Sequence, residues 1–495
     1  MSLEREIKLP VSPTFAMPPL DDAAPGVRAV ARDHATLHTV YFDAPDLRLV
    51  RAGASLRYRE GQSWTVKLPA AQGMPLLARE EVEFPDDGGV VPRDALELLR
   101  AYLRTADVVP VLRLRTSRRR WDLVGDADRV VAELVDDDVE VVSGSPGRVR
   151  FRELEVEAKA DGADRILVGV VARLRAAGAG EPDPTPKPAR ALGAIAAAPA
   201  DVLVRDLPND PTFSDVIRRA IARSVLHLIR HDPVVRLDAV PEGVHQARVA
   251  TRRLRSDLRT FAPLLDDTWT RSVRDELAWL GDTLGAARDA DVLLSRIRER
   301  VPRLAPTERP AAAEIVGALE RRHKEAHAAV MEVLATLRYA TLLDVLVDAA
   351  NAPALTRDAA RDAREVMPRL VRRPWKQLRS AVEEAADQPT ASVLHGIRIR
   401  AKRLRYAADA VSIVAGRSAR RLAAAAEEVQ DVLGEHQDAA VASAWLRTWA
   451  VDRSADAAFA AGVLGGHEDL AAATARARWR DAWRALDRRE LRGWM

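Results

Sequence analysis

The sequence contains no cysteine among its 495 residues. Disulfide bonds and thiolate metal sites are therefore excluded, and the composition is typical of a reducing compartment. The chain has no run of about 18 apolar residues, so no membrane-spanning helix is predicted. Its N-terminus lacks the apolar core of a secretory signal. We therefore expect a cytoplasmic protein with no membrane partner.

Aromatic residues are also scarce, at 4% of the chain. Single-stranded RNA is usually bound by stacking its bases on aromatic side chains, so this scarcity argues against nucleic acid as the partner. The charges nearly cancel, because 76 basic residues face 73 acidic ones and leave a net charge of +3. The places where charges cluster are therefore more informative than their sum.

Two periodicities divide the chain. About the first 160 residues alternate with the period of strands and are punctuated by Gly, Pro and Asp. From about residue 208 to the end, the chain is rich in Ala, Leu, Arg and Glu at helical spacing. The predicted strands in the first part include 54–59, 63–68, 79–84, 111–116, 130–135 and 149–157, with helices at 93–103 and 163–176.

Prolines mark the junction between the two parts. Four prolines lie within residues 181–190, and two more lie within residues 208–211. Proline clusters are typical of linkers between domains. We therefore predict a sheet domain at residues 1–200, a linker at 201–211 and a helical domain at 212–495.

The N-terminal segment carries Glu4, Glu6 and Lys8 at alternate positions. In a strand these side chains project from one face. Carboxylates on a shared face repel each other unless a cation lies between them, and Mg²⁺ is the usual cation for oxygen ligands. The lysine would then suit an anionic substrate.

The same one-sided charge recurs along later strands, as in the row Glu153, Glu155 and Glu157. A single charged face is ordinarily the solvated side of a sheet. Here the faces are nearly pure in sign, strand by strand, which indicates a closed antiparallel barrel with a polar interior. Acids would hold a metal, and bases would bind phosphate oxygens through charge-assisted hydrogen bonds worth about 1.5–3 kcal/mol each. The other charged faces are Arg57 with Arg59, Lys67, Glu81 with Glu83, Arg113 with Arg115, and Glu133 with Asp137.

In this order the motifs resemble those of the CYTH, or triphosphate tunnel metalloenzyme, family. The chain begins with a match to the family's E-x-E-x-K signature and later carries a match to its E-L-E-x-E strand. Lys187 is similar to the lysine of a late Ser-Lys pair, although Pro186 stands in place of the serine. The other matched positions are Arg57, Arg59, Lys67, Glu81, Glu83, Arg118 (three before Trp121) and Asp137, with Asp136 and Asp138 as alternative registers.

The resemblance implies an eight-stranded antiparallel β tunnel that binds a triphosphate. Family members hydrolyse inorganic triphosphate, thiamine triphosphate or RNA 5′-triphosphates, or cyclise ATP. We therefore expect a metal-dependent triphosphatase that hydrolyses inorganic triphosphate, polyphosphate or a related triphosphate with Mg²⁺ or Mn²⁺. The implied metal ligands are Glu4, Glu6, Asp137, Glu153 and Glu155. The implied catalytic residues are Glu4, Glu6, Lys8, Arg57, Arg59, Lys67, Glu81, Glu83, Arg118 and Lys187.

The helical part contains an internal repeat. Residues 245–255 and 395–405 both read H-x-x-R-x-x-x-[RK]-R-L-R, and 284–289 and 433–438 both begin with Leu-Gly and end with Asp. The first pair is offset by 150 positions and the second by 149, so we predict two similar helical bundles. The predicted bundles span about 212–345 and 360–495.

A histidine and several arginines form a basic stripe along the helix of each copy. Like charges four residues apart destabilise a helix by a few tenths of a kcal/mol per pair. A polyanion-binding face explains this arrangement better than a solvated face, and a histidine metal site is a further alternative. Asp289 and Asp438 are expected to pair with arginines.

These helices resemble the signature helices of the CHAD domain, a pair of helical bundles that often follows a CYTH domain and is associated with inorganic polyphosphate. The expected fold is therefore α+β with two domains, a β tunnel followed by an all-α pair of pseudo-repeated bundles. The alternatives are a non-catalytic polyphosphate-binding or targeting protein, or a protein that binds RNA or processes RNA 5′-triphosphates. The expected polyphosphate-binding residues are His245, Arg248, Arg252, Arg253, Arg255, Arg259, His395, Arg398, Lys402, Arg403 and Arg405.

Overall fold

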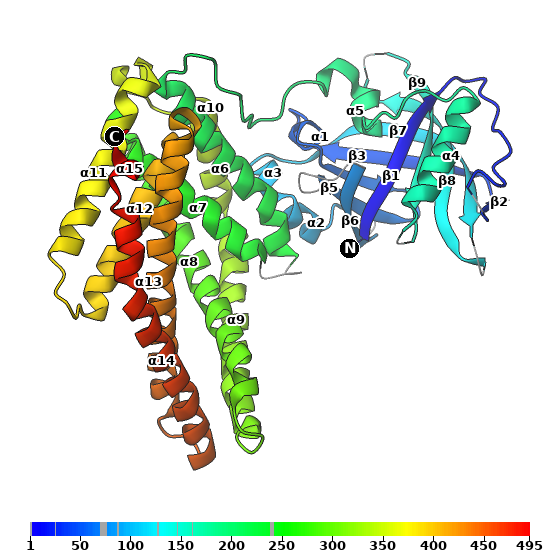
Figure 1. The fold of residues 1–495 in the computed structure, drawn as a ribbon. Helices are drawn as coiled ribbons and strands as arrows, with labels where there is room; N and C mark the ends of the chain where they lie inside the picture. The colour runs from blue at the N-terminus through cyan, green and yellow to red at the C-terminus, as the bar shows by residue number, and fades with distance from the viewer. Residues whose placement is uncertain are drawn as a thin grey trace. The chain divides into compact units, whose positions relative to one another are not determined.

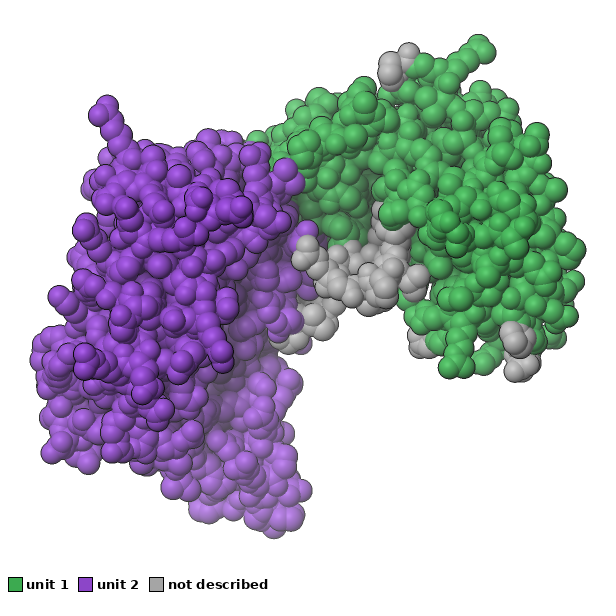
Figure 2. All heavy atoms as spheres, turned by 45° about the horizontal axis from the view of Figure 1, so that its top comes forward, with its two compact units in different colours: residues 1–201 green, residues 202–495 purple. Residues whose placement is uncertain are grey.

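The chain divides into two compact units, Met1–Asp201 and Val202–Met495 (Figure 2). The computed structural model shows a unit built on a β-sheet and a helical unit (Figure 1). The structure describes residues 2–24, 26–69, 77–86, 89–125, 128–145, 147–160, 162–237 and 242–495, except for the side chains of residues 2–4 and 77–79.

The strands of the first unit form one antiparallel sheet. They are β1 (Ser2–Val11), β2 (Arg28–Ala31), β3 (Ala35–Asp43), β4 (Ser55–Arg59), β5 (Ser63–Pro69), β6 (Leu77–Pro85), β7 (Val109–Val124), β8 (Val130–Ser143) and β9 (Arg150–Ala158). The helices of this unit are α1 (Arg48–Arg51), α2 (Arg93–Leu98), α3 (Arg100–Leu103), α4 (Asp164–Ala176) and α5 (Lys187–Leu192).

Eight of these strands close on themselves. Their order is β7-β3-β4-β5-β6-β1-β9-β8, and β8 pairs again with β7, while β2 pairs only with β7 among the described strands. The predicted eight-stranded antiparallel tunnel is therefore confirmed. The strands predicted at 111–116 and 130–135 were too short, because β7 and β8 continue through charged stretches that pair across the two strands.

Where α4 covers the sheet, the barrel carries charge inside and apolar side chains outside. Lys8 pairs in register with Glu155, and their neighbours Leu9 and Leu154 also pair. Leu9 and Leu154 belong to an apolar cluster with Leu167 and other residues of α4, which covers this part of the sheet. Successive side chains point to opposite faces of a strand, so burying the leucines against α4 turns the lysine and the glutamate inward.

The helical unit contains two sets of helices in the same order. The first set is α6 (Phe213–Arg236), α7 (Glu242–Thr260), α8 (Asp267–Arg300), α9 (Arg309–Leu334) and α10 (Leu337–Asn351). The second set is α11 (Ala363–Glu383), α12 (Ala391–Ala415), α13 (Arg417–Ala450), α14 (Ala455–Leu486) and α15 (Arg489–Arg492). The long pairs α8–α9 and α13–α14 run side by side (Figure 1).

The two sets begin next to each other. Phe213 donates its backbone N–H to the carbonyl of Arg361, and Ala363 donates to the carbonyl of Pro211, so the two first helices start at a reciprocal bridge. The pair of helical bundles expected from the repeat is confirmed by this arrangement. Within the described ranges, no helix has the length and apolarity needed to cross a membrane.

Three consecutive aspartates of β8 occupy different environments, which generates a stability prediction. Asp136 is buried and accepts two hydrogen bonds of 2.8 Å from Arg152 and one of 2.5 Å from Arg119. Asp136→Ala should lower the free energy of unfolding by about 3 kcal/mol, because it removes the carboxylate partner of the half-buried Arg152 and leaves it only its hydrogen bonds to the carbonyls of Pro13 and Phe15. Asp138→Ala is the matched control: it removes an exposed pair with Arg150 and should cost about 0.5 kcal/mol or less. Equal urea denaturation curves for the two variants would contradict the assignment.

Candidate functional site

A cavity of about 300 Å³ lies within the barrel. Charged side chains from seven of its strands and from α5 make up most of its lining. The lining residues are Lys8, Tyr41, Ser55, Arg57, Arg59, Lys67, Glu81, Glu83, Arg118, Glu133, Val135, Glu155, Glu157, Lys159, Pro186, Lys187 and Pro188.

Lys187 lies at the centre of the acidic wall. Its Nζ is 2.9 Å from Asp137 Oδ2, 2.9 Å from Glu153 Oε1 and 2.6 Å from Glu155 Oε1. It is the first residue of α5, and the preceding extended Pro186 directs the chain into this helix. One ammonium group therefore gathers three carboxylates that the sequence spreads over two strands.

Two further bases complete the neutralisation of these acids. Arg118 donates from Nε and Nη2 to the two oxygens of Asp137, at 2.8 and 2.6 Å. Lys8 lies 2.7 Å from Glu155 and 3.1 Å from Glu6. The paired fork on Asp137 fixes the orientation of Arg118 toward the cavity.

The electrostatics follow from this pairing. Burial alone would raise the pKa of Glu155, but Lys187, Lys8 and Arg118 outweigh it and hold that pKa well below its usual range. Burial would likewise raise the pKa of Asp137, and Lys187 and Arg118 lower it. Asp137 and Glu155 are therefore ionised at neutral pH, with their negative charge already balanced by lysine and arginine.

The opposite part of the cavity is basic. Glu81 pairs with Arg57 at 3.1 Å and with Lys67 at 3.0 Å. Burial, followed by the charges of Arg57 and Arg118, lowers the pKa of Arg59 to about 10. Among the described residues Arg59 forms no ion pair, and its buried Nε donates no hydrogen bond. The cavity thus holds a partly buried guanidinium that has no anionic partner among the described residues.

The structure brings most of the sequence-predicted residues into or beside this cavity. Glu4 lies in β1, but its side chain is outside the described part of the chain. The expectation for Arg113 and Arg115 is wrong: both are exposed, and Arg115 pairs with Glu140 on the outer side of the barrel. The predicted residues gathered here are Glu6, Lys8, Arg57, Arg59, Lys67, Glu81, Glu83, Arg118, Asp137, Glu153, Glu155 and Lys187.

Sequence reasoning missed several participants. Arg190 pairs with Glu153 at 2.8 Å, one helical turn after Lys187. Tyr41 and Lys159 line the cavity. Lys159 could have been found by its place after the Glu153 to Glu157 row, whereas no local pattern distinguishes Tyr41.

In the helical unit the two basic stripes converge. The guanidinium of Arg252 on α7 lies 5.5 Å from the ring centre of Tyr406 on α12. Burial, followed by Arg398, Arg252 and Arg248, lowers the pKa of Lys402 to about 7. Side chains of both stripes therefore contribute to one basic field.

Glycines of the second repeated motif lie beneath these arginines. A Cβ at Gly285 would lie 3.7 Å from Arg248 Nε, and one at Gly434 would lie 3.5 Å from Arg398 Nε. Arg248 also lies 3.8 Å from Asp289, so one of the two expected Asp–Arg pairs is present as a loose contact. The glycine of each motif, which has no side chain, thus leaves room for the arginine that lies over it. A groove of about 430 Å³ contains the first of these contacts.

A second basic groove of about 390 Å³ lies at the other end of α7. Arg259 and Arg403 line it together with Arg369 and Arg373 of α11, which sequence reasoning missed because they lie outside the repeated motif.

Two of the expected polyphosphate-binding arginines face acids instead. Arg253 lies 3.9 Å from Asp409, and Arg405 pairs with Glu427 at 2.7 Å. His245 and His395 both lie on the basic stripes; burial and Arg288 lower the pKa of His245.

Comparison with known proteins places both units. The family model of the CYTH domain matches residues 2–172, and that of the CHAD domain matches residues 219–447. The protein Rv2226 of Mycobacterium tuberculosis, described as uncharacterized, is 33% identical over 520 residues, covering 98% of this chain and 96% of that protein. The chain belongs to the CYTH–CHAD family.

Three further similarities were found. The protein MT2285 from another strain of M. tuberculosis shows the same identity and coverage as Rv2226. PptA from Streptomyces chartreusis is 23% identical with a TM-score of 0.48, covering 55% of this chain and 99% of that one. The CHAD domain from the plant Ricinus communis is 26% identical with a TM-score of 0.48, covering 58% and 96%.

CYTH proteins are metal-dependent, so the acidic wall must be tested as a metal site. Glu6, Asp137, Glu153 and Glu155 offer carboxylate oxygens, the donor type that Mg²⁺ and Mn²⁺ prefer. Three of these carboxylates already converge on one cationic atom, the Nζ of Lys187. The donor set therefore fits a hard divalent cation, which would share these oxygens with Lys187.

The depressed pKa values generate a prediction about acid stability. A carboxylate with a lowered pKa stabilises the fold above its ordinary pKa, and this contribution is lost as the pH falls through the folded value. Lys187→Met should make the barrel of this CYTH–CHAD protein open at a higher pH than in the wild type, because Asp137 and Glu155 lose their shared cation. Amide hydrogen exchange of β1 and β9, followed as a function of pH in the presence of a chelator, measures the change in the pH of opening.

The control for this experiment is Lys159→Met. Lys159 lines the same cavity but is more exposed than Lys187, and the ion pair described for it is with a single carboxylate, that of Glu157 at 2.7 Å. Identical acid transitions in the two variants would contradict the central role of Lys187.

Proposed function

We propose that the CYTH unit hydrolyses the phosphoanhydride bond of inorganic triphosphate or of a polyphosphate end. The observation that carries this proposal is Arg59, a partly buried guanidinium beside Arg57 and Arg118 with no ion pair among the described residues. Partial burial of a charge without a partner costs free energy, so this part of the cavity favours an anionic ligand. Phosphate oxygens suit guanidinium groups through charge-assisted hydrogen bonds.

The chain's own residues divide the work by charge. Arg57, Arg59 and Arg118 bind phosphate oxygens, orient the chain of phosphates and stabilise the negative charge that develops as the bond breaks. Glu6 and Glu155 are the carboxylates adjacent to Lys8 and, together with Asp137 and Glu153, would hold Mg²⁺ or Mn²⁺. The bound ion would supply Lewis-acid polarisation of the phosphoryl group and a lower pKa for an attacking water.

We also propose that the CHAD unit binds inorganic polyphosphate. Its two basic stripes present arginines from both repeats, and burial, followed by repulsion from these arginines, lowers the pKa of Lys402 to about 7. A long polyanion relieves this repulsion at several positions at once. The low aromatic content favours a polyphosphate chain over RNA.

A second candidate is a protein that binds polyphosphate without turning it over. It is favoured by Lys187, which already occupies the centre of the acids that would hold the metal. The two candidates differ in one observable, the release of phosphate.

Hydrolysis is tested with purified protein, tripolyphosphate and either Mg²⁺ or Mn²⁺. We expect phosphate release in the wild type, none in the double variant Glu4→Gln with Glu6→Gln, and roughly 100-fold less in Arg59→Met, because a charge-stabilising donor is lost. Glu140→Gln, which removes an exposed carboxylate outside the barrel, should retain full activity. Absence of release by the wild type with both metals would establish the binding candidate, and full release by the double variant would reject the metal role of these glutamates.

Polyphosphate binding is tested by titration calorimetry. Arg248→Ala with Arg398→Ala, one change in each repeat, should raise the Kd at least about tenfold per side chain. Arg271→Ala removes an equally charged but exposed side chain of α8 and should leave the Kd unchanged.

Binding by the wild type should weaken between about pH 6 and pH 8 as Lys402 loses its proton, and Lys402→Arg should flatten this dependence. RNA that displaces polyphosphate at matched charge would contradict the proposed ligand.

A further inference from the structure

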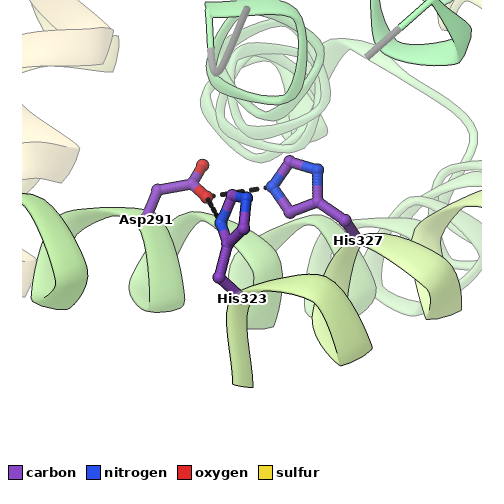
Figure 3. A group of neighbouring side chains, drawn as sticks. All are labelled: Asp291, His323 and His327. Carbon is purple, nitrogen blue, oxygen red and sulfur yellow. Dashed lines mark hydrogen bonds and ion pairs between the residues drawn. The ribbon is translucent and has the colours of Figure 1, made fainter. Parts of the chain in front are cut away.

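One cluster of side chains in the helical unit shares no residue with either basic groove. Asp291 on α8 faces His323 and His327 on α9 (Figure 3). Both rings point to the same carboxylate oxygen, Oδ1, with His323 Nδ1 at 2.8 Å and His327 Nε2 at 2.9 Å (Figure 3). The three ligand-type atoms all lie within 4.8 Å of one another.

The hydrogen bonds within this cluster leave one of its carboxylate oxygens without a partner. Asp291 is buried, with its side chain 5% exposed, yet its second oxygen, Oδ2, accepts no hydrogen bond from any described residue. A buried carboxylate oxygen without a partner costs free energy. His323 and His327 are four residues apart, so one face of α9 presents both rings to the same point.

The second repeat shows that the helical bundle does not require such a cluster. Asp289 matches Asp438 in the repeated motif, so the position equivalent to Asp291 on α13 is Ala440. On α14, residues 470–476 contain no histidine. The equivalent positions of α13 and α14 therefore hold no such cluster, and the contact given there is of His436 Nδ1 with the carbonyl of Ala472 at 3.1 Å. Among the described residues, a trio of one carboxylate and two histidines is particular to α8 and α9.

We propose that Asp291, His323 and His327 bind a divalent transition metal of the zinc class and clamp α8 to α9. Two imidazoles and one carboxylate suit zinc and its first-row neighbours, in contrast to the oxygen-only donors of the barrel. Each neutral imidazole would carry its proton on its other ring nitrogen, so that the unprotonated Nδ1 of His323 and Nε2 of His327 would be the metal ligands. The remaining coordination position is open to water. The proposal does not depend on the activity of the barrel.

The test is a titration of the chelator-stripped full chain with Zn²⁺ in an excess of Mg²⁺, which occupies oxygen-lined sites. We expect one equivalent to bind and to raise the unfolding temperature of the helical unit, because the metal binds the folded state alone. His323→Gln, at a half-exposed position, and Asp291→Asn, of nearly equal shape, should each weaken binding at least roughly 100-fold.

The matched control is His467→Gln on α14, which removes one histidine from the corresponding helix of the second repeat and should keep the zinc stoichiometry and affinity. Circular dichroism of each variant without metal shows whether it is folded, so a loss of binding is separated from a loss of structure. Failure of the wild type to bind Zn²⁺, or equal binding by wild type and a folded His323→Gln variant, would overturn the proposal.

Discussion

The interaction on which the rest of the barrel depends is the contact of one ammonium group, that of Lys187, with three carboxylates. Asp137 and Glu153 are completely buried, and carboxylates that are taken out of water remain ionised only where cations compensate them. Lys187 reaches them because α5 begins beside the barrel. A strand order that closes through β7 and β8 then holds this charged interior together, while the apolar side chains pack outside against α4.

The two units handle charge in opposite ways. In the barrel, acids and bases lie together and many are paired, whereas Arg59 forms no ion pair with any described residue and can bind an anion. In the helical unit, two stripes of like charge face a common region, and burial, followed by the repulsion between them, lowers the pKa of Lys402. The barrel is therefore a site whose charges are largely compensated and in which Arg59 favours an anionic ligand. The helical unit presents an extended basic surface that a polyanion can neutralise.

The alternation of side chains along the strands predicted many of the residues that face the barrel interior. The spacing of Glu153 and Glu155 placed both on the inner face, because burial of the intervening Leu154 fixes the register. The same reasoning failed for Arg115, which differs from Arg118 by three positions and therefore points to the other face of β7. The full length of β7 and β8 could not be predicted, because the charged residues in each strand pair with residues of the other strand and no local pattern shows this.

Contacts between distant segments were beyond sequence patterns. Arg369 and Arg373 join Arg259 only because α11 packs near α7 and α12. Asp291 is separated from His323 by 32 positions, and nothing in either local sequence indicates that they meet. Such residues are brought together by the packing of helices, which a periodic pattern describes for each helix alone.

The most direct test of the account is a crystal structure of the protein with tripolyphosphate and Mn²⁺, in which anomalous scattering locates the metal. The account predicts Mn²⁺ at the carboxylates beside Lys8 and Lys187, with phosphate oxygens against Arg59 and Arg118 inside the barrel. Tripolyphosphate bound only outside the barrel, with no anomalous peak at these carboxylates, would contradict it.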